Sequence, residues 1–413
     1  MRYGLIGEHL GHSFSKLLHG RMSSEPYVLC ELSPGELPDF FRKRDFLGIN
    51  VTIPYKQAVI PFLDELDPSA QLTGAVNTIV NRGGILTGFN TDYDGFIALS
   101  RHAGVRFDGA RVVILGRGGA AKAAAAAALS EGAVSVVKAV RTPSAEGEVP
   151  LDAPSAWGGC DIIVNATPVG MYPHWDGSVV PPSVFDNVSG ALDCIYNPLK
   201  TAFVLDAEKA GIPAEGGLYM LVAQAVRARE IFDAVSLPED MTESLYDSLL
   251  RSKRNIVLCG MPSCGKTTIG KALAERCGRR FADTDELVVM QAGMDIPDIF
   301  SREGEADFRA RETAAIESIA AEQGLVIATG GGAILSERNL RLLRHNGLVC
   351  LLERSPELLT PTADRPLSRD RASISALYLK RMPLYSAAAD VVISNNGSPE
   401  DTLEKLASYV DRG

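Results

Sequence analysis

The sequence lacks an excess of positive charge, a cysteine framework and a long apolar run. Its formal net charge is −10, which argues against a general affinity for nucleic acid, because nucleic acid is bound by basic surfaces. Its seven cysteines are scattered and form no C-x-x-C pair, which argues against a disulfide framework and a zinc site. The alanine-rich run at 120–129 contains Lys122 and is too short to span a bilayer. We therefore expect a cytoplasmic protein that acts neither on nucleic acid nor in a membrane.

The composition that is present is that of an ordinary globular protein, with 46% apolar and 22% charged residues in a chain of 413. At about 150 residues per domain, this length predicts two or three domains. The first residues, Tyr3–Ile6, are typical of a strand and not of a signal peptide. Short apolar runs alternate with helix-like segments in the first part of the chain, which predicts an α/β fold with a mostly parallel sheet.

One stretch, Gly260–Thr268, has the form G-x-x-x-x-G-K-[ST] between the apolar run Ile256–Cys259 and the helix-like Ile269–Arg276. Backbone N–H groups of such a turn bind phosphates, the lysine adds a positive charge and the following hydroxyl binds Mg²⁺. The alternative is a chance glycine turn, which would require neither the strand nor the helix. We expect ATP to be bound by Ser263, Cys264, Gly265, Lys266, Thr267 and Thr268.

Four polar clusters also follow apolar runs, at Gly11–Lys16, Gly48–Lys56, Gly74–Thr78 and Gly88–Asp92. They supply hydroxyls, amides, a lysine and an aspartate, which suit a polyhydroxylated anionic substrate. The alternatives are helix caps for the serines and a surface ion pair for the lysine and the aspartate.

A second glycine turn, Gly116–Ala121, lies between the strand-like Arg111–Leu115 and the alanine-rich run. The pattern G-x-G-x-x-A in this setting indicates dinucleotide binding. The next predicted strand, Val134–Val140, is followed by Arg141 where an NAD-specific fold carries an acidic residue. This arginine favours the 2′-phosphate of NADP. Arg117, between the glycines, either adds a phosphate contact or points to solvent.

The clusters S-x-S, N-V-T-x-P-x-K, G-A-V-N-T and G-x-N-T-D, in this order, resemble shikimate dehydrogenase. The motif D-x-x-Y-N-P-x-x-T at Asp193–Thr201 and the helix start at Gly216–Gln224 extend the resemblance to about residue 250. It implies that Lys56 is the catalytic proton donor and acceptor and that Asp92 acts beside it. The implied substrate ligands are Ser13, Ser15, Thr52, Asn77, Asp92, Tyr196 and Gln224. The implied NADP(H) ligands are Gly116, Arg117, Gly118, Gly119, Ala120, Arg141, Thr142 and Gly217, while Val140 replaces the asparagine that usually precedes Arg-Thr.

The motifs D-T-D, F-R, G-G-G-A, R-P-L and R-x-P-L-Y, spread over residues from about 254 to 411, resemble shikimate kinase. The resemblance implies that Asp285 takes the substrate hydroxyl, that Lys266 and Arg365 act on the phosphoryl group and that Asp283 helps Thr267 to hold Mg²⁺. The implied shikimate ligands are Asp285, Arg309, Gly331 and Arg381, and Arg365 is also an ATP ligand. The lid at Glu357–Asp364 is short and lacks the arginine that family members often place before it to stack on adenine.

We therefore expect a substrate-binding α/β domain at 1–105, an NADP-binding Rossmann domain at 106–250 and a P-loop domain like the nucleoside monophosphate kinases at 254–413. A helix at 237–250 would pack back on the first domain, and 251–253 would be the connector. The expected function is NADPH-dependent reduction of 3-dehydroshikimate to shikimate, followed by MgATP-dependent phosphorylation to shikimate 3-phosphate. The alternative is a quinate/shikimate dehydrogenase that uses NAD, joined to a module that only binds nucleotide. The sequence does not indicate an oligomeric state.

Overall fold

The computed structural model describes residues 2–10, 14–175, 177–361 and 370–411, which form two compact units. Unit 1 comprises Met1–Asn197 and Thr201–Tyr246, and unit 2 comprises Pro198–Lys200 and Asp247–Gly413. The division falls inside helix α8 (Met241–Lys253). Residues 251–253, expected as a connector, therefore continue this helix.

The first sheet of unit 1 has the strand order β2-β1-β3-β5-β6-β4. Strands β1, β2 and β3 are parallel, but β5 pairs antiparallel with both β3 and β6. The expectation of a mostly parallel sheet missed this hairpin, which Gly83 and Gly84 close with φ of 62° and 91°. A positive φ at both central residues is what a tight hairpin turn requires. The strands are β1 (Tyr3–Gly7), β2 (Tyr27–Glu31), β3 (Gly48–Val51), β4 (Glu65–Leu66), β5 (Thr78–Arg82) and β6 (Ile85–Phe89), and the helices are α1 (Ser15–Met22), α2 (Leu37–Lys43), α3 (Pro68–Thr73) and α4 (Thr91–His102).

The second sheet of unit 1 is parallel throughout and has the order β12-β11-β10-β7-β8-β9. Strands β8 and β9 follow β7 on one side of the sheet, and β10, β11 and β12 lie on the other side of β7. Open α/β sheets bind ligands at such a switch point, here between β7 and β10. Helix α5 directly follows β7, as the alanine run predicts from its high helix propensity. The elements are β7 (Arg111–Leu115), β8 (Ser135–Val140), β9 (Glu148–Pro150), β10 (Ile162–Asn165), β11 (Gly190–Asp193), β12 (Ala214–Glu215), α5 (Gly119–Ser130), α6 (Ala202–Lys209) and α7 (Leu218–Asp233).

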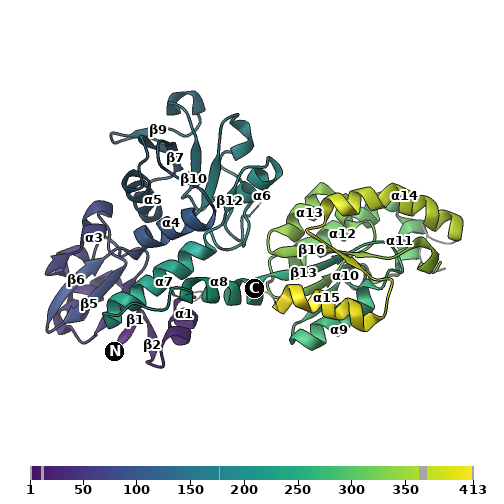
Figure 1. Ribbon diagram of the computed structural model, residues 1–413, viewed down its shortest axis with the longest axis horizontal. Coiled ribbons are helices and arrows are strands. Elements are labelled where there is room, and N and C mark those ends of the chain that lie inside the picture. The colour runs from purple at the N-terminus through teal and green to yellow at the C-terminus, as the bar shows by residue number, and fades with distance from the viewer. Residues whose placement is uncertain (1, 11–13, 176, 362–369, 412–413) are drawn as a thin grey trace. The chain divides into compact units, whose positions relative to one another are not determined.

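Helices α4 and α7 pack against each other between the two sheets of unit 1 (Figure 1). Gly95 of α4 permits this approach, since a Cβ at this position would lie 2.8 Å from the carbonyl oxygen of Met220 on α7. Buried apolar residues on the first sheet, including Ile49, Val76 and Leu86, form a core of their own. A separate core lies on the second sheet around Val113 and Ile163.

Unit 2 is a five-stranded parallel sheet in the order β14-β15-β13-β16-β17. The paired helices α9 and α15 lie on one face, and α12 and α13 lie on the other (Figure 1). The strands are β13 (Asn255–Cys259), β14 (Phe281–Asp283), β15 (Val326–Ala328), β16 (Gly347–Glu353) and β17 (Val391–Ser394). The helices are α9 (Lys266–Cys277), α10 (Thr284–Ala292), α11 (Ile296–Arg302), α12 (Glu305–Ala320), α13 (Glu337–Arg344), α14 (Arg371–Ala388) and α15 (Pro399–Asp411).

The expected combination of α/β folds is confirmed by these three sheets. Short 3₁₀ turns lie at Pro34–Glu36, Ile60–Phe62, Pro154–Trp157, Pro182–Val184, Ala333–Leu335 and Pro356–Leu358. Across the described residues, none of the helices combines the length and the apolar character that crossing a membrane requires.

The close packing of α4 on α7 predicts that Gly95→Ala destabilises unit 1 by about 1–3 kcal/mol, because the added methyl group pushes the two helices apart. The matched control is Gly20→Ala inside α1, where a Cβ would meet nothing within 4 Å. That change should be neutral or stabilising by up to about 1 kcal/mol, owing to the higher helix propensity of alanine. Calorimetric unfolding measures both effects, and an unchanged transition in Gly95→Ala would contradict the packing argument.

Candidate active sites

Unit 1 contains a cavity of about 460 Å³ that both of its sheets line. The first sheet and the segments that follow its strands contribute Ser15, Thr52, Lys56, Asn77 and Asp92. The second sheet and its helices contribute four more expected residues, which are Ala120, Tyr196, Gly217 and Gln224. Residues from distant parts of the sequence thus meet at one cavity.

The charged centre of this cavity is an ion pair between Lys56 and Asp92, with 2.5 Å between Nζ and Oδ2. The two side chains are 22% and 13% exposed, so the pair is largely shielded from solvent. Asp92 lies in the first turn of α4, where the helix dipole stabilises a carboxylate. Asn90 caps the same helix, because its side chain accepts hydrogen bonds from the backbone N–H groups of Asp92 and Tyr93. The pair is therefore a positioned feature of the cavity and not a solvated surface bridge.

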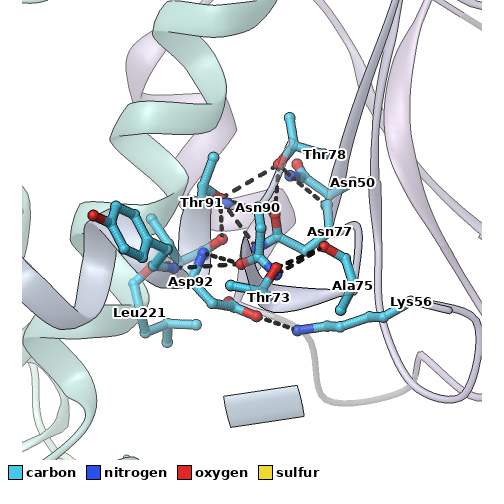
Figure 2. Close-up of polar contacts among 12 residues, drawn as sticks. Asn50, Lys56, Thr73, Ala75, Asn77, Thr78, Asn90, Thr91, Asp92 and Leu221 are labelled. Carbon is cyan, nitrogen blue, oxygen red and sulfur yellow. Dashed lines mark hydrogen bonds and ion pairs between the residues drawn. The ribbon is translucent and has the colours of Figure 1, made fainter. Parts of the chain in front are cut away.

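A buried network of amides and hydroxyls lies behind this pair (Figure 2). Asn77 is 4% exposed, and its Oδ1 accepts a hydrogen bond of 2.7 Å from the backbone N–H of Thr91, next to Asp92. Asn50 is 7% exposed, donates to Thr78 Oγ1 at 3.0 Å and accepts from the hydroxyl of Tyr27 at 2.7 Å. Because buried polar groups are costly when unpaired, this network holds Asn77 and the start of α4 in one arrangement.

The glycine turn of the second sheet approaches the lysine directly. A Cβ on Gly119, the first residue of α5, would lie 3.7 Å from Cδ of Lys56. Gly116 has φ of 108°, and a Cβ there would lie 3.0 Å from the carbonyl oxygen of Ala166. The turn therefore needs glycine, and it brings the N-terminal end of α5, where backbone N–H groups attract phosphates, to the side of the lysine.

The segment that carries Tyr196 is anchored by a buried aspartate. Asp193, at the end of β11, accepts hydrogen bonds from Thr201 Oγ1 at 2.5 Å, from the backbone N–H of Ile195 and from Asn165. Burial raises the pKa of Asp193 to about 6. Burial likewise raises the pKa of Tyr196, so this phenol remains neutral and can donate a hydrogen bond into the cavity.

The remaining expected cofactor residues lie at the ends of β7 and β8. Arg141 and Thr142 directly follow β8 and are exposed. The Arg117 side chain is 51% exposed. Its Nη1 donates to Ser144 Oγ at 2.8 Å and lies 3.5 Å from Glu148 Oε2.

Unit 2 contains a second cavity, of about 260 Å³, at the turn between β13 and α9. The turn adopts positive φ at Gly260, Ser263 and Gly265, with values of 140°, 63° and 97°. Lys266 is 7% exposed, and its Nζ donates to the carbonyl oxygens of Gly260 and Met261, both at 3.0 Å. The lysine side chain is therefore hydrogen-bonded to the backbone of its own loop. The cavity is lined by Ser263, Gly265, Lys266, Thr267, Thr268, Asp283, Asp285 and Thr329, while Cys264 is buried beneath the turn.

The residues expected to hold Mg²⁺ lie together. Thr267 Oγ1 donates to Asp283 Oδ2 at 2.7 Å, and Asp283 also caps α10 through the backbone N–H of Asp285. No cluster of three or more His, Cys, Asp or Glu side chains able to hold a metal occurs among the described residues. A hydroxyl and one carboxylate nevertheless fit Mg²⁺, which keeps several waters and takes further oxygens from nucleotide phosphates.

Beside this cavity, the glycine run 330–332 passes between two arginines. Arg381 is 7% exposed and donates from Nη1 to the carbonyl oxygen of Gly331 at 2.8 Å. Arg309 Nη1 donates to Glu312 Oε2 at 2.8 Å. A Cβ on Gly330 would lie 2.8 Å from Glu312 Oε1, so a larger residue cannot replace it without movement. A Cβ on Gly330 would also collide with Oδ1 of Asp285. Both arginines and Asp285 therefore lie around one stretch of backbone.

Glu312 is one of the residues at these sites that the sequence analysis did not single out. It is 1% exposed, and burial raises the pKa of its carboxyl group. The signal was present, because Glu312 follows Arg309 by three residues on α12 and such a pair lies on one helix face. His9 and Thr329 also line the two cavities and were not expected there. Two expected residues, Ser13 and Arg365, lie outside the described part of the chain.

Comparison with protein families gives two matches. Residues 5–79 match the family model of the shikimate dehydrogenase substrate-binding domain. Residues 262–411 match that of shikimate kinase. The first match ends near the Asn77 network, and the second begins within the phosphate-binding turn.

Curated relatives and solved structures resemble unit 1. A shikimate dehydrogenase (NADP(+)) from Moorella thermoacetica is 34% identical over 63% of this chain and 96% of its own length. A second shikimate dehydrogenase (NADP(+)), from Caldicellulosiruptor bescii, is 40% identical over 59% of this chain and 94% of its own length. The structure of a chorismate mutase/shikimate 5-dehydrogenase fusion protein from Clostridium acetobutylicum matches with a TM-score of 0.57 at 37% identity, over 60% of this chain and 96% of that one. The structure of a Thermus thermophilus shikimate 5-dehydrogenase in complex with NADP(H) and shikimate matches with a TM-score of 0.52 at 31% identity. The match covers 60% of this chain and 98% of that one.

The buried network predicts that Asn50→Ala destabilises unit 1 by about 1–3 kcal/mol, because the hydroxyls of Tyr27 and Thr78 each lose a buried partner. The matched control is Asn187→Ala, which removes the same group from an exposed turn and should change stability by less than about 0.5 kcal/mol. Denaturant unfolding of both variants provides the comparison. Equal effects would show that the network does not stabilise the site.

Proposed function

Because the chain belongs to the shikimate dehydrogenase family and its second unit matches the shikimate kinase family model, we propose that it catalyses two consecutive reactions. Unit 1 reduces 3-dehydroshikimate to shikimate with NADPH, and unit 2 phosphorylates shikimate with MgATP to shikimate 3-phosphate. The observation that carries the first reaction is the Lys56–Asp92 pair beside the glycine turn of α5. The second reaction is supported by the glycine turn before α9 and by Asp285, which line one cavity.

In the first reaction, the nicotinamide supplies the hydride, and the protein must supply a proton to the ketone oxygen that becomes an alkoxide. Lys56 lies in the cavity and donates this proton from Nζ, while Asp92 orients the ammonium group. In the reverse direction the lysine accepts the proton of the 3-hydroxyl. Ser15, Asn77 and Gln224, which line the same cavity, hold the hydroxyl and carboxylate groups of the substrate.

In the second reaction, the 3-hydroxyl of shikimate attacks the γ-phosphoryl group of ATP. Asp285 accepts the hydroxyl proton, and Lys266 turns from the loop carbonyls to the phosphates with the N-terminal N–H groups of α9. Arg309 and Arg381 bind the substrate carboxylate, a task suited to the guanidinium group. Thr267 and Asp283 would hold Mg²⁺, which would neutralise charge on the nucleotide phosphates.

NADP(H), and not NAD, is the proposed cofactor, since Arg141 follows β8 where NAD-specific proteins carry an acidic residue. The NAD-dependent quinate reading is not favoured, because the relatives above are described as NADP-dependent. The substrates are small molecules. We place the enzyme in the cytoplasm, where free thiols such as its seven cysteines are the stable form.

Two single substitutions separate the two activities. Lys56→Ala should lower the NADP⁺-dependent oxidation of shikimate by a factor of at least about 10², because the proton acceptor is lost. It should leave the formation of ADP from ATP and shikimate intact. Lys266→Ala should have the opposite pattern. Reduced-nicotinamide absorbance and a coupled ADP assay measure the two rates.

The proposal for unit 1 would be abandoned if the wild-type protein with NADP⁺ and shikimate produced no reduced nicotinamide. The proposal for unit 2 would be abandoned if ATP bound but was not consumed with shikimate. Loss of both activities in either variant would show that the two sites are not independent.

The contact between Arg309 and Glu312 predicts that Glu312→Gln raises the KM for shikimate in the kinase reaction by about tenfold, because a charge-assisted hydrogen bond to the carboxylate-binding arginine weakens. The KM for MgATP should be unchanged. Glu305→Gln is the matched control, since Glu305 also contacts Arg309, at 3.2 Å, but is 56% exposed. If both variants raised the KM equally, burial of Glu312 would not be the cause.

A further inference from the structure

A carboxylate of this chain occupies an anion-binding turn at the edge of the dinucleotide site. Oε2 of Glu148, on the edge strand β9, accepts hydrogen bonds from the backbone N–H groups of Ser144 at 2.8 Å and Ala145 at 3.2 Å. The same oxygen lies 3.4 Å from Ser144 Oγ and 3.5 Å from Arg117 Nη1. The Glu148 side chain is only 7% exposed. Every one of these donors converges on a single oxygen atom.

This donor set is the kind that binds phosphate. Successive backbone N–H groups in a turn form a concave anion site, and a hydroxyl and a guanidinium group complete it. The turn directly follows Arg141 and Thr142 at the end of β8, where a Rossmann fold receives the 2′-position of the adenosine ribose. Arg117 comes from the glycine turn after β7 and reaches the same place. A 2′-phosphate bound here would therefore share Arg117 with the carboxylate of Glu148.

We propose that Glu148 is a specificity-determining residue that competes with the 2′-phosphate of NADP(H) for Arg117 and for the turn at 144–145. The inference rests on the proposed dehydrogenase function. With the carboxylate in place, the enzyme binds NADP(H) less tightly than its two arginines would otherwise allow, and its preference over NAD(H) is reduced. Hydrogen bonding from the backbone of Ser144 lowers the pKa of Glu148, so the competing charge is present throughout the neutral range.

The test is Glu148→Gln, which removes the charge but keeps an oxygen that accepts from the backbone N–H groups. It should lower the KM for NADP⁺ and the Kd for NADPH by about threefold to tenfold. The constants for NAD⁺ and NADH, which lack the 2′-phosphate, should change by less than about twofold. The matched control is Glu146→Gln, an exposed residue of the same turn. It removes an equal charge and should change neither set of constants.

A double-variant cycle tests the part played by Arg117. In an Arg117→Gln background, Glu148→Gln should no longer tighten the binding of NADPH, because the arginine for which Glu148 and the 2′-phosphate compete is absent. Binding of NADPH and NADH, followed by their own fluorescence, requires no turnover. It therefore tests Glu148 even if the proposed oxidation of shikimate fails.

Weaker NADPH binding in Glu148→Gln would overturn the inference, since it would mean that the carboxylate positions Arg117 for the phosphate. Equal constants for the wild type and the variant would overturn it too. An equal increase in affinity for NADPH and NADH would also overturn it, because NADH lacks the 2′-phosphate.

Discussion

Both sites depend on one constraint, which is that the backbone must turn from a buried strand into a helix with its N–H groups facing outward. The chain adopts positive φ at Gly116, Gly260 and Gly265. A Cβ would lie 3.0 Å from a backbone carbonyl oxygen at Gly116 and 2.7 Å from one at Gly260. Glycine relieves the collision and exposes the helix N-terminus to anions. The other functional side chains are arranged around these two turns.

Charged groups at both sites are held by buried partners and not by solvent. In unit 1, the Asn50, Asn77 and Thr91 network fixes the start of the helix that carries Asp92. In unit 2, Glu312 holds Arg309 from beneath the glycine run. Oε1 of Glu312 has no hydrogen-bond partner among the described residues, so this carboxylate is held through Oε2 alone. In unit 1, the hydrogen bonds of the network hold Asn77 and the start of α4 in one arrangement.

Much of this arrangement could be predicted from the sequence because the motifs are local. A glycine turn between a strand and a helix uses residues that are close in the chain, so Gly116–Ala121 and Gly260–Thr268 could be recognised directly. Lys56 and Asp92 were expected together from the resemblance to shikimate dehydrogenase, whose motifs are also short segments. The β5–β6 hairpin was not predicted, although Gly83-Gly84 between two apolar runs is a signal for a tight hairpin turn.

The sequence alone determined the fold class, the two nucleotide-binding turns and most of the residues that line the two cavities, because each is encoded within a short segment. Tertiary structure decided which side chains brace those residues. The Arg309–Glu312 pair is local to α12, but Glu312 is buried only because this helix packs beside the glycine run. Glu148 meets Arg117 only because β9 pairs with β8. Burial and contacts between distant segments depend on packing between elements, and no local pattern specifies them.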